Sequence, residues 1–389
     1  MAQQQYAYFL NVAADANKNK FYELKIEGGQ LIARFGRVGT AGQTKVYQAY
    51  EWDKVCRDRR AHGYDDVTHL RAKTESVAFL PLTGTVAELV AHLRKVAGES
   101  ISRNYASGET VTEAMVDRAQ TVLDEIGRLN GRASVWAVNS KLQELWAILP
   151  RKMRRVSDHL LPQNATAADI SQKMRDEQDL LDQMRAQVAT ATAQTTVEDQ
   201  TVLDAMGIEM REATAAEKDE VMALVEQKNR GRVQRIFRVV NKRTQDAFDK
   251  VQGATGDPRM FFHGSYTANW WSIVSQGLTI RPSATNGSAL GRGLYFANLF
   301  QKSAGYTDVQ GAYWTGGTNS VGYMGVFAVK MGKMKVLSNG ASGNEDARAK
   351  AGEFDSVHLK GGVVNVNDEF AVYRNDRVTI AYLIEIKPS

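Results

Sequence analysis

The side chains that could do chemistry are concentrated in one stretch of the chain, with one addition far downstream. They are His263, Gly264, Ser265, Tyr295, Ser303, Tyr306 and the distant Glu369. One imidazole, two phenols, two hydroxyls, a glycine and a carboxylate could line a flat slot for an aromatic ring. Their spacing matches neither a set of metal ligands nor a glycine-rich loop that cradles phosphate. The set therefore indicates a slot for a planar ligand, built without a metal.

Four separated runs carry these residues in one order along the chain. They are His263-Gly264-Ser265, Gly293-Leu294-Tyr295-Phe296-Ala297, Lys302-Ser303-Ala304-Gly305-Tyr306 and Asn367-Asp368-Glu369-Phe370. Their order and rough spacing resemble the catalytic domain of the poly(ADP-ribose) polymerase family, which carries a His-Tyr-Glu triad. Several separated motifs in family order are much more specific than any one of them, because a lone HGS or GLYFA is a weak signal.

The resemblance implies NAD as the substrate and a triad of His263, Tyr295 and Glu369. Cleavage of the bond to nicotinamide passes through an oxocarbenium-like transition state, which one carboxylate suits. Glu369 would bond the ribose next to nicotinamide and orient the incoming nucleophile, whereas the neighbouring Asp368 is expected to matter less. His263 and Ser265 would hold the adenosine ribose.

The same resemblance implies a binding slot for the nicotinamide group. The backbone of Gly264 and the hydroxyl of Ser303 would clamp the carboxamide, and a glycine there lets the backbone approach closely. Tyr295 and Tyr306 would sandwich the ring.

Length and composition bound the class of protein. A chain of 389 residues suggests two or three domains, and 43% apolar with 24% charged residues is ordinary for globular material. The sequence contains no run of about 18 apolar residues, so no membrane span is predicted. The N-terminus lacks the pattern of a secretion signal. We therefore expect no membrane partner and a location inside the cell, cytoplasmic if the source is bacterial or viral and nuclear if it is eukaryotic.

The single cysteine and the net charge limit the chemistry further. Cys56 alone can form neither an intramolecular disulfide nor a multi-cysteine zinc site, and we expect no metal cofactor. The formal net charge of +5 permits a polyanionic partner without requiring one.

Residues 1–80 alternate short strand patterns with glycine turns. A hairpin turn is predicted at Gly28-Gly29. Strands are predicted at residues 6–13, 20–27, 30–35 and 44–50, and a basic helix at residues 51–62. This pattern favours a small α+β domain.

Residues 20–45 resemble a WGR domain, named for a Trp-Gly-Arg motif. The resemblance implies binding to DNA ends or nicks. Phe35 stands where that family has Trp and keeps an aromatic face for stacking, while Arg37 is retained and could contact either a phosphate or the helices that follow. Twelve Lys and Arg against nine Asp and Glu give residues 1–80 a net charge of +3, which is compatible with phosphate contact.

Residues 85–190 carry helical periodicity nearly throughout. Apolar faces repeat over residues 115–129, 135–149 and 170–184. Residues 142–153 resemble a segment of the helical regulatory domain of the same family, which implies a bundle that shields the NAD site until DNA binds. The stretch at 189–196, rich in Ala and Thr, is predicted to be a polar linker.

Residues 200–389 change to mixed helices and strands. Strands are predicted at residues 233–240, 260–263, 294–297, 326–329, 369–373 and 378–387, and helices at 215–226 and 244–251. The last strand alternates apolar and polar residues, so one buried face is expected. No GxGxxG motif follows a strand, which argues against a Rossmann site; the resemblance instead implies an α+β transferase fold with a split, mainly antiparallel β-core.

These observations together predict a protein of three domains, at residues 1–80, 85–190 and 200–389. The predicted activity is NAD-dependent transfer of ADP-ribose to protein acceptors, including the chain itself, stimulated by DNA ends. One alternative is a DNA- or RNA-binding module whose transferase fold is inactive. Another is a free-standing, toxin-like transferase that ignores DNA.

Overall fold

The structure is a computed structural model that describes residues 5–71, 78–105, 111–128, 134–196, 200–252, 256–281, 289–338, 340–362 and 366–389. The chain divides into two compact units. The first unit consists of Met1–Glu75 and Gly98–Val188, and the second consists of Ser76–Ala97 and Ala189–Ser389. Helices α2 (Gly84–Asn104) and α5 (Ala167–Thr196) each contribute residues to both units.

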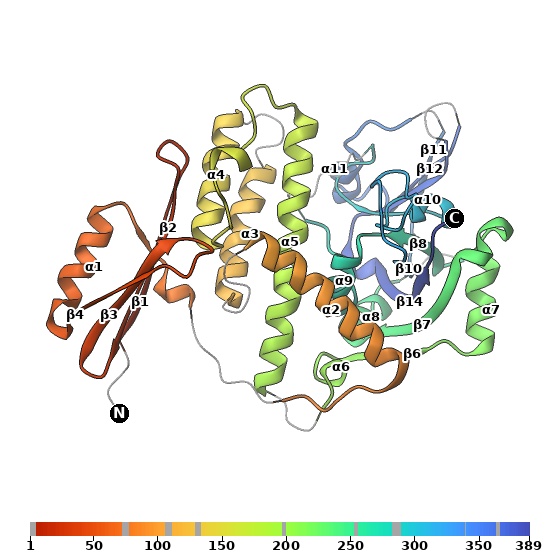
Figure 1. Ribbon diagram of the computed structural model, residues 1–389. Coiled ribbons are helices and arrows are strands. Elements are labelled where there is room, and N and C mark those ends of the chain that lie inside the picture. The colour runs from red at the N-terminus through yellow and green to blue at the C-terminus, as the bar shows by residue number, and fades with distance from the viewer. Residues whose placement is uncertain are drawn as a thin grey trace. The chain divides into compact units, whose positions relative to one another are not determined.

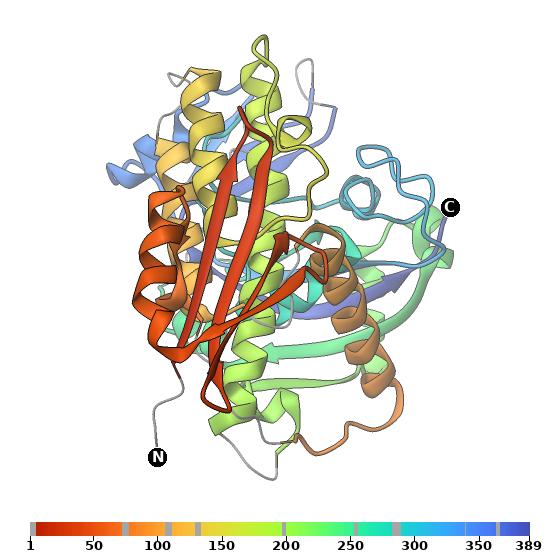
Figure 2. The ribbon, with the colours of Figure 1, turned by 60° about the vertical axis from the view of Figure 1, so that its left-hand side comes forward.

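The first unit begins with a five-stranded antiparallel sheet (Figures 1 and 2). In the order β4-β3-β2-β1-β5, its strands are β4 (Gln43–Gln48), β3 (Gln30–Arg37), β2 (Lys18–Glu27), β1 (Tyr6–Ala13) and β5 (Asp65–Asp66). Gly28 and Gly29 join β2 to β3 with φ values of 57° and 76°, which confirms the predicted hairpin. The predicted basic helix is α1 (Trp52–Ala61).

The two faces of this sheet pack against different helices because side chains alternate along a strand. Ala7 and Phe9 of β1 belong to a buried cluster with Cys56 of α1. Tyr8 and Leu10 belong to a larger buried cluster shared with the helices that follow. The sheet of this unit is therefore a layer between α1 and the other helices.

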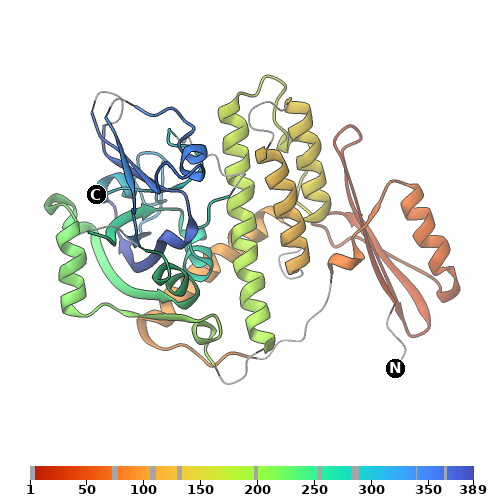
Figure 3. The ribbon, with the colours of Figure 1, turned by 180° about the vertical axis from the view of Figure 1, so that it is seen from behind.

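Those helices are α3 (Glu113–Arg128), α4 (Val135–Ile148) and α5, which Figure 3 shows standing side by side. The predicted apolar face of α3 is buried, as expected from its periodicity. Its buried residues include Met115, Val116, Ala119, Val122, Leu123 and Ile126. Leu129, the last predicted member of this face, lies outside the described residues. Short 3-10 helices lie at Ala49–Glu51, Thr68–Leu70 and Ser157–His159.

The polar linker predicted at residues 189–196 is wrong, because α5 continues to Thr196. Alanine is the strongest helix former, and extending an existing helix costs much less than starting one. Thr190 is also buried, and its hydroxyl accepts a hydrogen bond of 3.2 Å from Nε1 of Trp271. Packing within the second unit therefore stabilises as helix a stretch whose composition suggested a linker.

The second unit contains two sheets. The first sheet, fully antiparallel, has the order β6 (Ile208–Glu212), β7 (Val233–Asn241), β14 (Val378–Ile386), β10 (Gly322–Val329) and β8 (Arg259–Gly264). The second has the order β11 (Met334–Leu337), β12 (Ser356–Leu359), β13 (Glu369–Val372) and β9 (Leu294–Phe296), and only its β11–β12 pair is parallel. This arrangement agrees with the expected α+β fold with mainly antiparallel sheets.

The prediction that β14 buries one face is wrong, because every residue of the strand is buried. β14 lies in the middle of its sheet, between β7 and β10. Its two polar residues are paired: Thr379 contacts the Thr244 hydroxyl at 3.1 Å, and Glu385 accepts hydrogen bonds from Arg235 at 2.6 and 3.1 Å. Polar residues in a strand therefore do not require a solvent-exposed face when neighbouring strands supply partners.

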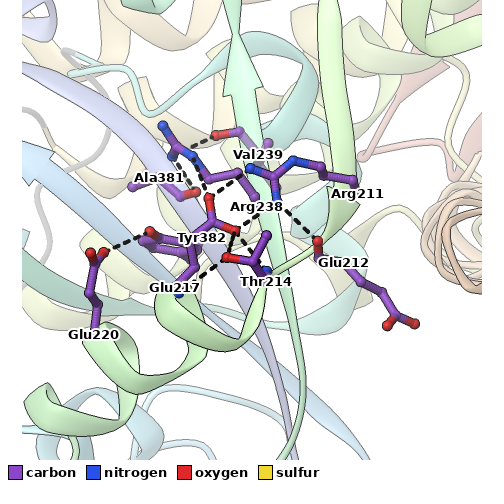
Figure 4. A network of polar contacts seen from close by, with 9 residues as sticks. All are labelled: Arg211, Glu212, Thr214, Glu217, Glu220, Arg238, Val239, Ala381 and Tyr382. Atoms are coloured by element: carbon purple, nitrogen blue, oxygen red, sulfur yellow. Dashed lines mark hydrogen bonds and ion pairs between the residues drawn. The ribbon is translucent and has the colours of Figure 1, made fainter.

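Helix α7 (Ala215–Leu224) is fixed to this sheet by a polar network (Figure 4). Thr214 and Glu217 form a capping box, with the Thr214 backbone N–H donating to Glu217 at 2.8 Å. Arg211 of β6 donates two hydrogen bonds of 2.7 Å to the same carboxylate. Arg211 and the cap together lower the pKa of Glu217 to about 2. Arg238 of β7 donates to the carbonyl of Ala381 in β14 at 2.7 Å, which extends the network across the sheet.

The remaining helices of the second unit are short. They are α6 (Val202–Ala205), α8 (Lys242–Asp249), α9 (Trp270–Gln276), α10 (Phe300–Ala304) and α11 (Glu345–Lys350), with 3-10 helices at Gln227–Arg232, Thr267–Asn269 and Asn375–Arg377. Within the ranges that the structure describes, no helix combines the length and the apolar character that crossing a membrane would need.

Candidate active site

His263 and Tyr295 meet because the two sheets of the second unit are bridged next to them. Phe262 and Ala297 exchange backbone hydrogen bonds of 2.8 and 3.0 Å, which joins the end of β8 to the end of β9. His263 Nδ1 lies 3.0 Å from the carbonyl oxygen of Tyr295. Because a carbonyl only accepts, Nδ1 carries the proton in this bond. Burial lowers the pKa of His263, partly offset by this bond, which favours a neutral imidazole with Nε2 as an acceptor.

Gly264 lies directly against helix α10. A Cβ at this position would overlap the carbonyl oxygen of Ser303 and would lie 3.3 Å from Cβ of Tyr306. Only glycine permits this approach. The structure thus brings together the two separated runs that hold Gly264 and Ser303. Ser265, next along the chain, accepts a hydrogen bond of 3.1 Å from the Asn269 side chain.

Helix α10 is short, and a carboxylate caps its first turn. Glu226 accepts hydrogen bonds from the backbone N–H groups of Phe300 at 3.0 Å and Gln301 at 3.2 Å. Phe300 is completely buried in the core of the unit. These two anchors hold the polar face of α10, with Lys302 and the buried Ser303, in place.

The two site tyrosines have different neighbours. The hydroxyl of Tyr295 donates to the carbonyl of Gly291 at 2.6 Å and accepts from the N–H of Leu290 at 3.1 Å, so it is attached to the turn before β9. Tyr306 is half-exposed and stacks on Trp314. Burial raises the pKa of the Tyr306 phenol, and the charge of Glu369 raises it further.

Glu369 begins β13 and is paired with a lysine. Its Oε1 accepts from Nζ of Lys302 at 2.9 Å, and the same ammonium donates to the backbone carbonyl of Asp368 at 3.1 Å. The side chain of Glu369 is 22% exposed, so a ligand can reach it. Lys302 was not among the predicted site residues, although it lies in one of the four runs. Only the folded chain shows that its ammonium faces Glu369.

Asp368, next to Glu369, is engaged elsewhere. Its carboxylate accepts from the backbone N–H of Gly361 at 2.7 Å and lies 2.8 Å from Nε2 of His358. The Gly361 hydrogen bond, followed by His358, lowers the pKa of Asp368. The His358 ring in turn stacks on Phe370, with 4.3 Å between ring centroids. The two adjacent acids therefore have separate surroundings, and His358 is a further residue that the sequence did not single out.

The Phe35-Gly36-Arg37 motif lies in the first unit. Phe35 stacks on Tyr22 with 5.1 Å between ring centroids and an interplanar angle of 12°. A Cβ on Gly36 of β3 would lie 2.9 Å from Cα of Gly42, so the close approach of these two backbone segments requires glycine there. Arg37 Nε donates to the carbonyl of Met153 at 2.9 Å.

Arg37 has two further partners, one in the same segment and one in the turn between β1 and β2. One of its terminal nitrogens donates to the carbonyl of Arg154, and to Oδ1 of Asn17 at 3.2 Å. Of the two contacts that the sequence left open for Arg37, the structure contains the one to the helical region.

The segment that receives Arg37 also meets a buried carboxylate. Arg151 forms an ion pair with Glu177 of α5, and Lys173 pairs with the same carboxylate at 2.9 Å. Tyr105 donates to Glu177 at 2.8 Å. Within the first unit, Arg37 and Glu177 of α5 therefore bind the same short segment at residues 151–154.

The arrangement in the second unit suits a planar, sugar-linked ligand rather than a metal. It offers a glycine-lined approach at Gly264, a buried hydroxyl at Ser303, an exposed aromatic face at Tyr306 and a reachable carboxylate at Glu369. Across the ranges described, no group of three or more His, Cys, Asp or Glu side chains could hold a metal ion.

Two protein-family models match the chain. The model described as the poly(ADP-ribose) polymerase catalytic domain matches residues 217–388, and that of the WGR domain matches residues 6–69. The chain is 28% identical over 181 residues to the uncharacterized protein 101L of Invertebrate iridescent virus 6, a match that covers 46% of this chain and 76% of that protein.

Two plant proteins are also similar. The chain is 36% identical over 121 residues to poly [ADP-ribose] polymerase 1 of Oryza sativa subsp. japonica, covering 31% of this chain and 11% of that protein. It is 41% identical over 73 residues to poly [ADP-ribose] polymerase 2-B of the same plant, covering 18% and 12%. The chain therefore matches only a small part of the length of these two polymerases.

Proposed function

We propose that the chain is an NAD-dependent protein ADP-ribosyltransferase of the poly(ADP-ribose) polymerase family, because the models of that catalytic domain and of the WGR domain match residues 217–388 and 6–69. The observation that carries the proposal is that the strands of the three residues are neighbours: His263 Nδ1 bonds the Tyr295 carbonyl, and β13, which begins at Glu369, pairs with β9, which contains Tyr295. In the proposed reaction the bond between nicotinamide and ribose breaks, and the ribose carbon bonds to a nucleophile on the acceptor. Proteins, including the chain itself, are the proposed acceptors.

Glu369 is the proposed catalytic carboxylate. Positive charge develops on the ribose as the bond to nicotinamide breaks, and a nearby carboxylate stabilises it. Lys302 holds Oε1 of Glu369 at 2.9 Å, which restricts the rotamers of the side chain. We propose that this lysine positions Glu369 toward a hydroxyl of the ribose, where it orients the nucleophile.

The other site residues are proposed to bind NAD. The Gly264 backbone and the Ser303 hydroxyl would hold the carboxamide, and Tyr295 and Tyr306 would line the ring. His263, with Nδ1 bonded to the Tyr295 carbonyl, would present Nε2 to the adenosine ribose together with Ser265. No metal is needed in this scheme, because the charge that develops is positive.

We further propose that nucleic acid ends stimulate the activity through the first unit. Arg37 bonds the carbonyl of Met153, and Arg151, two residues earlier, pairs with Glu177 of α5. Helix α5 continues into the second unit, where the Thr190 hydroxyl accepts a hydrogen bond from Trp271. A ligand that favours one state of these contacts can shift the activity only by its differential affinity for the two states. In this proposal residues 1–80 bind the nucleic acid, residues 85–190 shield the NAD site, and residues 200–389 carry out the reaction.

The test is incubation of the full chain with NAD labelled in the ADP-ribose part. We expect release of nicotinamide and transfer of label to protein, increased by nicked or blunt-ended duplex. The alternative, a DNA- or RNA-binding module with an inactive transferase fold, predicts nucleic acid binding without release of nicotinamide. A chain that ignores all nucleic acids but transfers label would support the toxin-like alternative. The expected location inside the cell, where NAD and nucleic acid are both present, belongs to the same proposal.

A further inference from the structure

The segment after Tyr306 is a loop with a firmly anchored base. The carboxylate of Asp308 accepts from the backbone N–H of Thr267 at 2.9 Å and from its hydroxyl at 2.7 Å. Val309 is completely buried in the core of the unit. Gln310 and Asn319 close the base, because the N–H of Gln310 donates to the carbonyl of Asn319 at 2.8 Å. The loop is therefore held in one place on the body of the unit.

The tip of this loop folds back onto the residue before Tyr306. The N–H of Trp314 donates to the carbonyl of Gly305 at 3.0 Å. A Cβ on Gly305 would lie 2.9 Å from Cδ1 of Trp314, so the absence of a side chain is what lets the indole approach. Trp314 then stacks on Tyr306 with 5.9 Å between ring centroids and an interplanar angle of 22°, and Tyr313 crosses Trp314 at 90° and 4.7 Å.

These three rings are unusually exposed for aromatic side chains. Tyr306 is 41% exposed, Trp314 is 61% exposed and Tyr313 is 81% exposed. Rings in such a position contribute little to the core, and an exposed group of apolar residues indicates a binding surface. Tyr306 is already one of the residues proposed to line the nicotinamide ring.

We propose that Trp314 is a positioning residue that holds Tyr306 in the orientation needed to stack on nicotinamide. This inference rests on the proposed function. An exposed tyrosine ring can rotate away from a ligand. The stacked indole, held by the backbone bond of Trp314 to Gly305 and by its contact with Tyr313, restricts that rotation before the ligand arrives. Binding to a pre-oriented ring loses less conformational entropy, so the gain is in affinity. Because Trp314 touches no reacting atom, its effect belongs in the binding of NAD and nicotinamide and not in bond breaking.

The test measures binding of nicotinamide to the full chain by calorimetry, together with the KM for NAD and kcat. An aromatic pair contributes a factor of about 2 to 10, so Trp314→Ala should weaken nicotinamide binding and raise the KM about 3- to 10-fold while kcat changes less than about 2-fold. Trp314→Phe, which keeps a ring, should restore most of the affinity. Gly305→Ala should act like Trp314→Ala, because the added Cβ displaces the indole.

The controls separate positioning from folding. Trp314→Ala should leave the unfolding midpoint nearly unchanged, because the ring is mostly exposed, and Tyr313→Ala should weaken binding less than Trp314→Ala. Unchanged nicotinamide affinity in Trp314→Ala overturns the inference, as does an equal loss in kcat with no change in affinity. If the wild-type chain binds nicotinamide but turns over no NAD, the proposed activity is wrong. The nicotinamide affinity of Trp314→Ala then decides this inference alone. If the wild type binds neither compound, both are wrong.

Discussion

Two glutamates, one in each unit, accept a hydrogen bond from a lysine at the same distance. Glu177 lies 2.9 Å from Lys173, and Glu369 lies 2.9 Å from Lys302. The side chain of Glu177 is fully buried and also pairs with Arg151, whereas that of Glu369 is 22% exposed. A lysine–glutamate distance therefore does not distinguish a structural ion pair from one proposed to be catalytic. The surroundings of the carboxylate do.

The two carboxylates differ in their expected roles: Glu177 stabilises the fold, and Glu369 is proposed to act in the reaction. Burial alone would raise the pKa of Glu177, but Arg151 and Lys173 outweigh it, so its pKa lies below the ordinary value. Removing this charge would leave two cations facing each other in a buried place. Removing the charge of Glu369 leaves one lysine close to solvent, but takes away the group that would stabilise the reacting sugar.

The largest expected effect is on stability, at Glu177. Glu177→Ala should lower the free energy of unfolding of the first unit by about 3–5 kcal/mol, the range for breaking a buried ion pair. Denaturant unfolding followed by circular dichroism measures this.

Glu144→Ala is the matched control, because Glu144 pairs with Lys141 on the surface and its loss should cost less than about 1 kcal/mol. Since the folded pKa of Glu177 is lowered, its contribution is present above the ordinary pKa of a glutamate and is lost as the pH falls through the folded value. Equal stability of the Glu177→Ala and Glu144→Ala variants would contradict the structural role.

The next largest effect is on turnover, at Glu369. Glu369→Gln keeps the shape of the side chain and removes its charge, and should lower kcat by about 10²-fold or more. The free energy of unfolding and the affinity for NAD should change little, because the charge acts mainly in the transition state. Nicotinamide release measures kcat, and His263→Ala, which should weaken NAD binding instead, is the contrast. Equal turnover in Glu369→Gln and the wild type would contradict the proposal that Glu369 is the catalytic carboxylate.

A smaller effect is expected at Arg37, which connects the first sheet to the segment before Glu177. Arg37→Ala should abolish stimulation by blunt-ended duplex, in the range of about 5- to 150-fold for typical coupling, and leave basal turnover intact. Added salt should also reduce the stimulation, as phosphate contacts weaken. Arg34→Ala is the control, because Arg34 lies on the same strand but pairs with Glu23.

A second comparison tests the same relay. Residues 200–389 alone are proposed to be active without nucleic acid, because the proposed shield is gone. If the full chain without nucleic acid is as active as residues 200–389, the helices are only a spacer and Arg37 has no regulatory role.

The smallest effect is expected at Asp368. Asp368→Asn keeps the side chain's shape but weakens its bonds to Gly361 and His358. We expect a loss in kcat of less than about tenfold, because these bonds fix the backbone before Glu369 but touch no reacting atom. Steady-state kinetics beside Glu369→Gln measure the difference. A loss at Asp368 as large as that at Glu369 would exchange the roles of the two acids.

The sequence by itself determined several of the local elements and the resemblance to a family. Strand alternation placed β1 and β3 close to their observed bounds, and helical periodicity identified the buried face of α3, because both signals depend on neighbours a few residues apart. The four ordered runs identified the catalytic domain, which the family comparison supports. Two predictions failed where distant packing decides: residues 189–196 are helix, and β14 is buried on both faces.

Only the tertiary structure decided which side chains meet. The ammonium of Lys302 reaches Glu369 across 67 positions of chain, and the indole of Trp314 reaches Tyr306 because Gly305 leaves room. Arg37 finds its carbonyl partners 116 and 117 positions away. No periodic pattern along the chain records such contacts, since they arise when separate elements pack and bring their polar groups within hydrogen-bond distance.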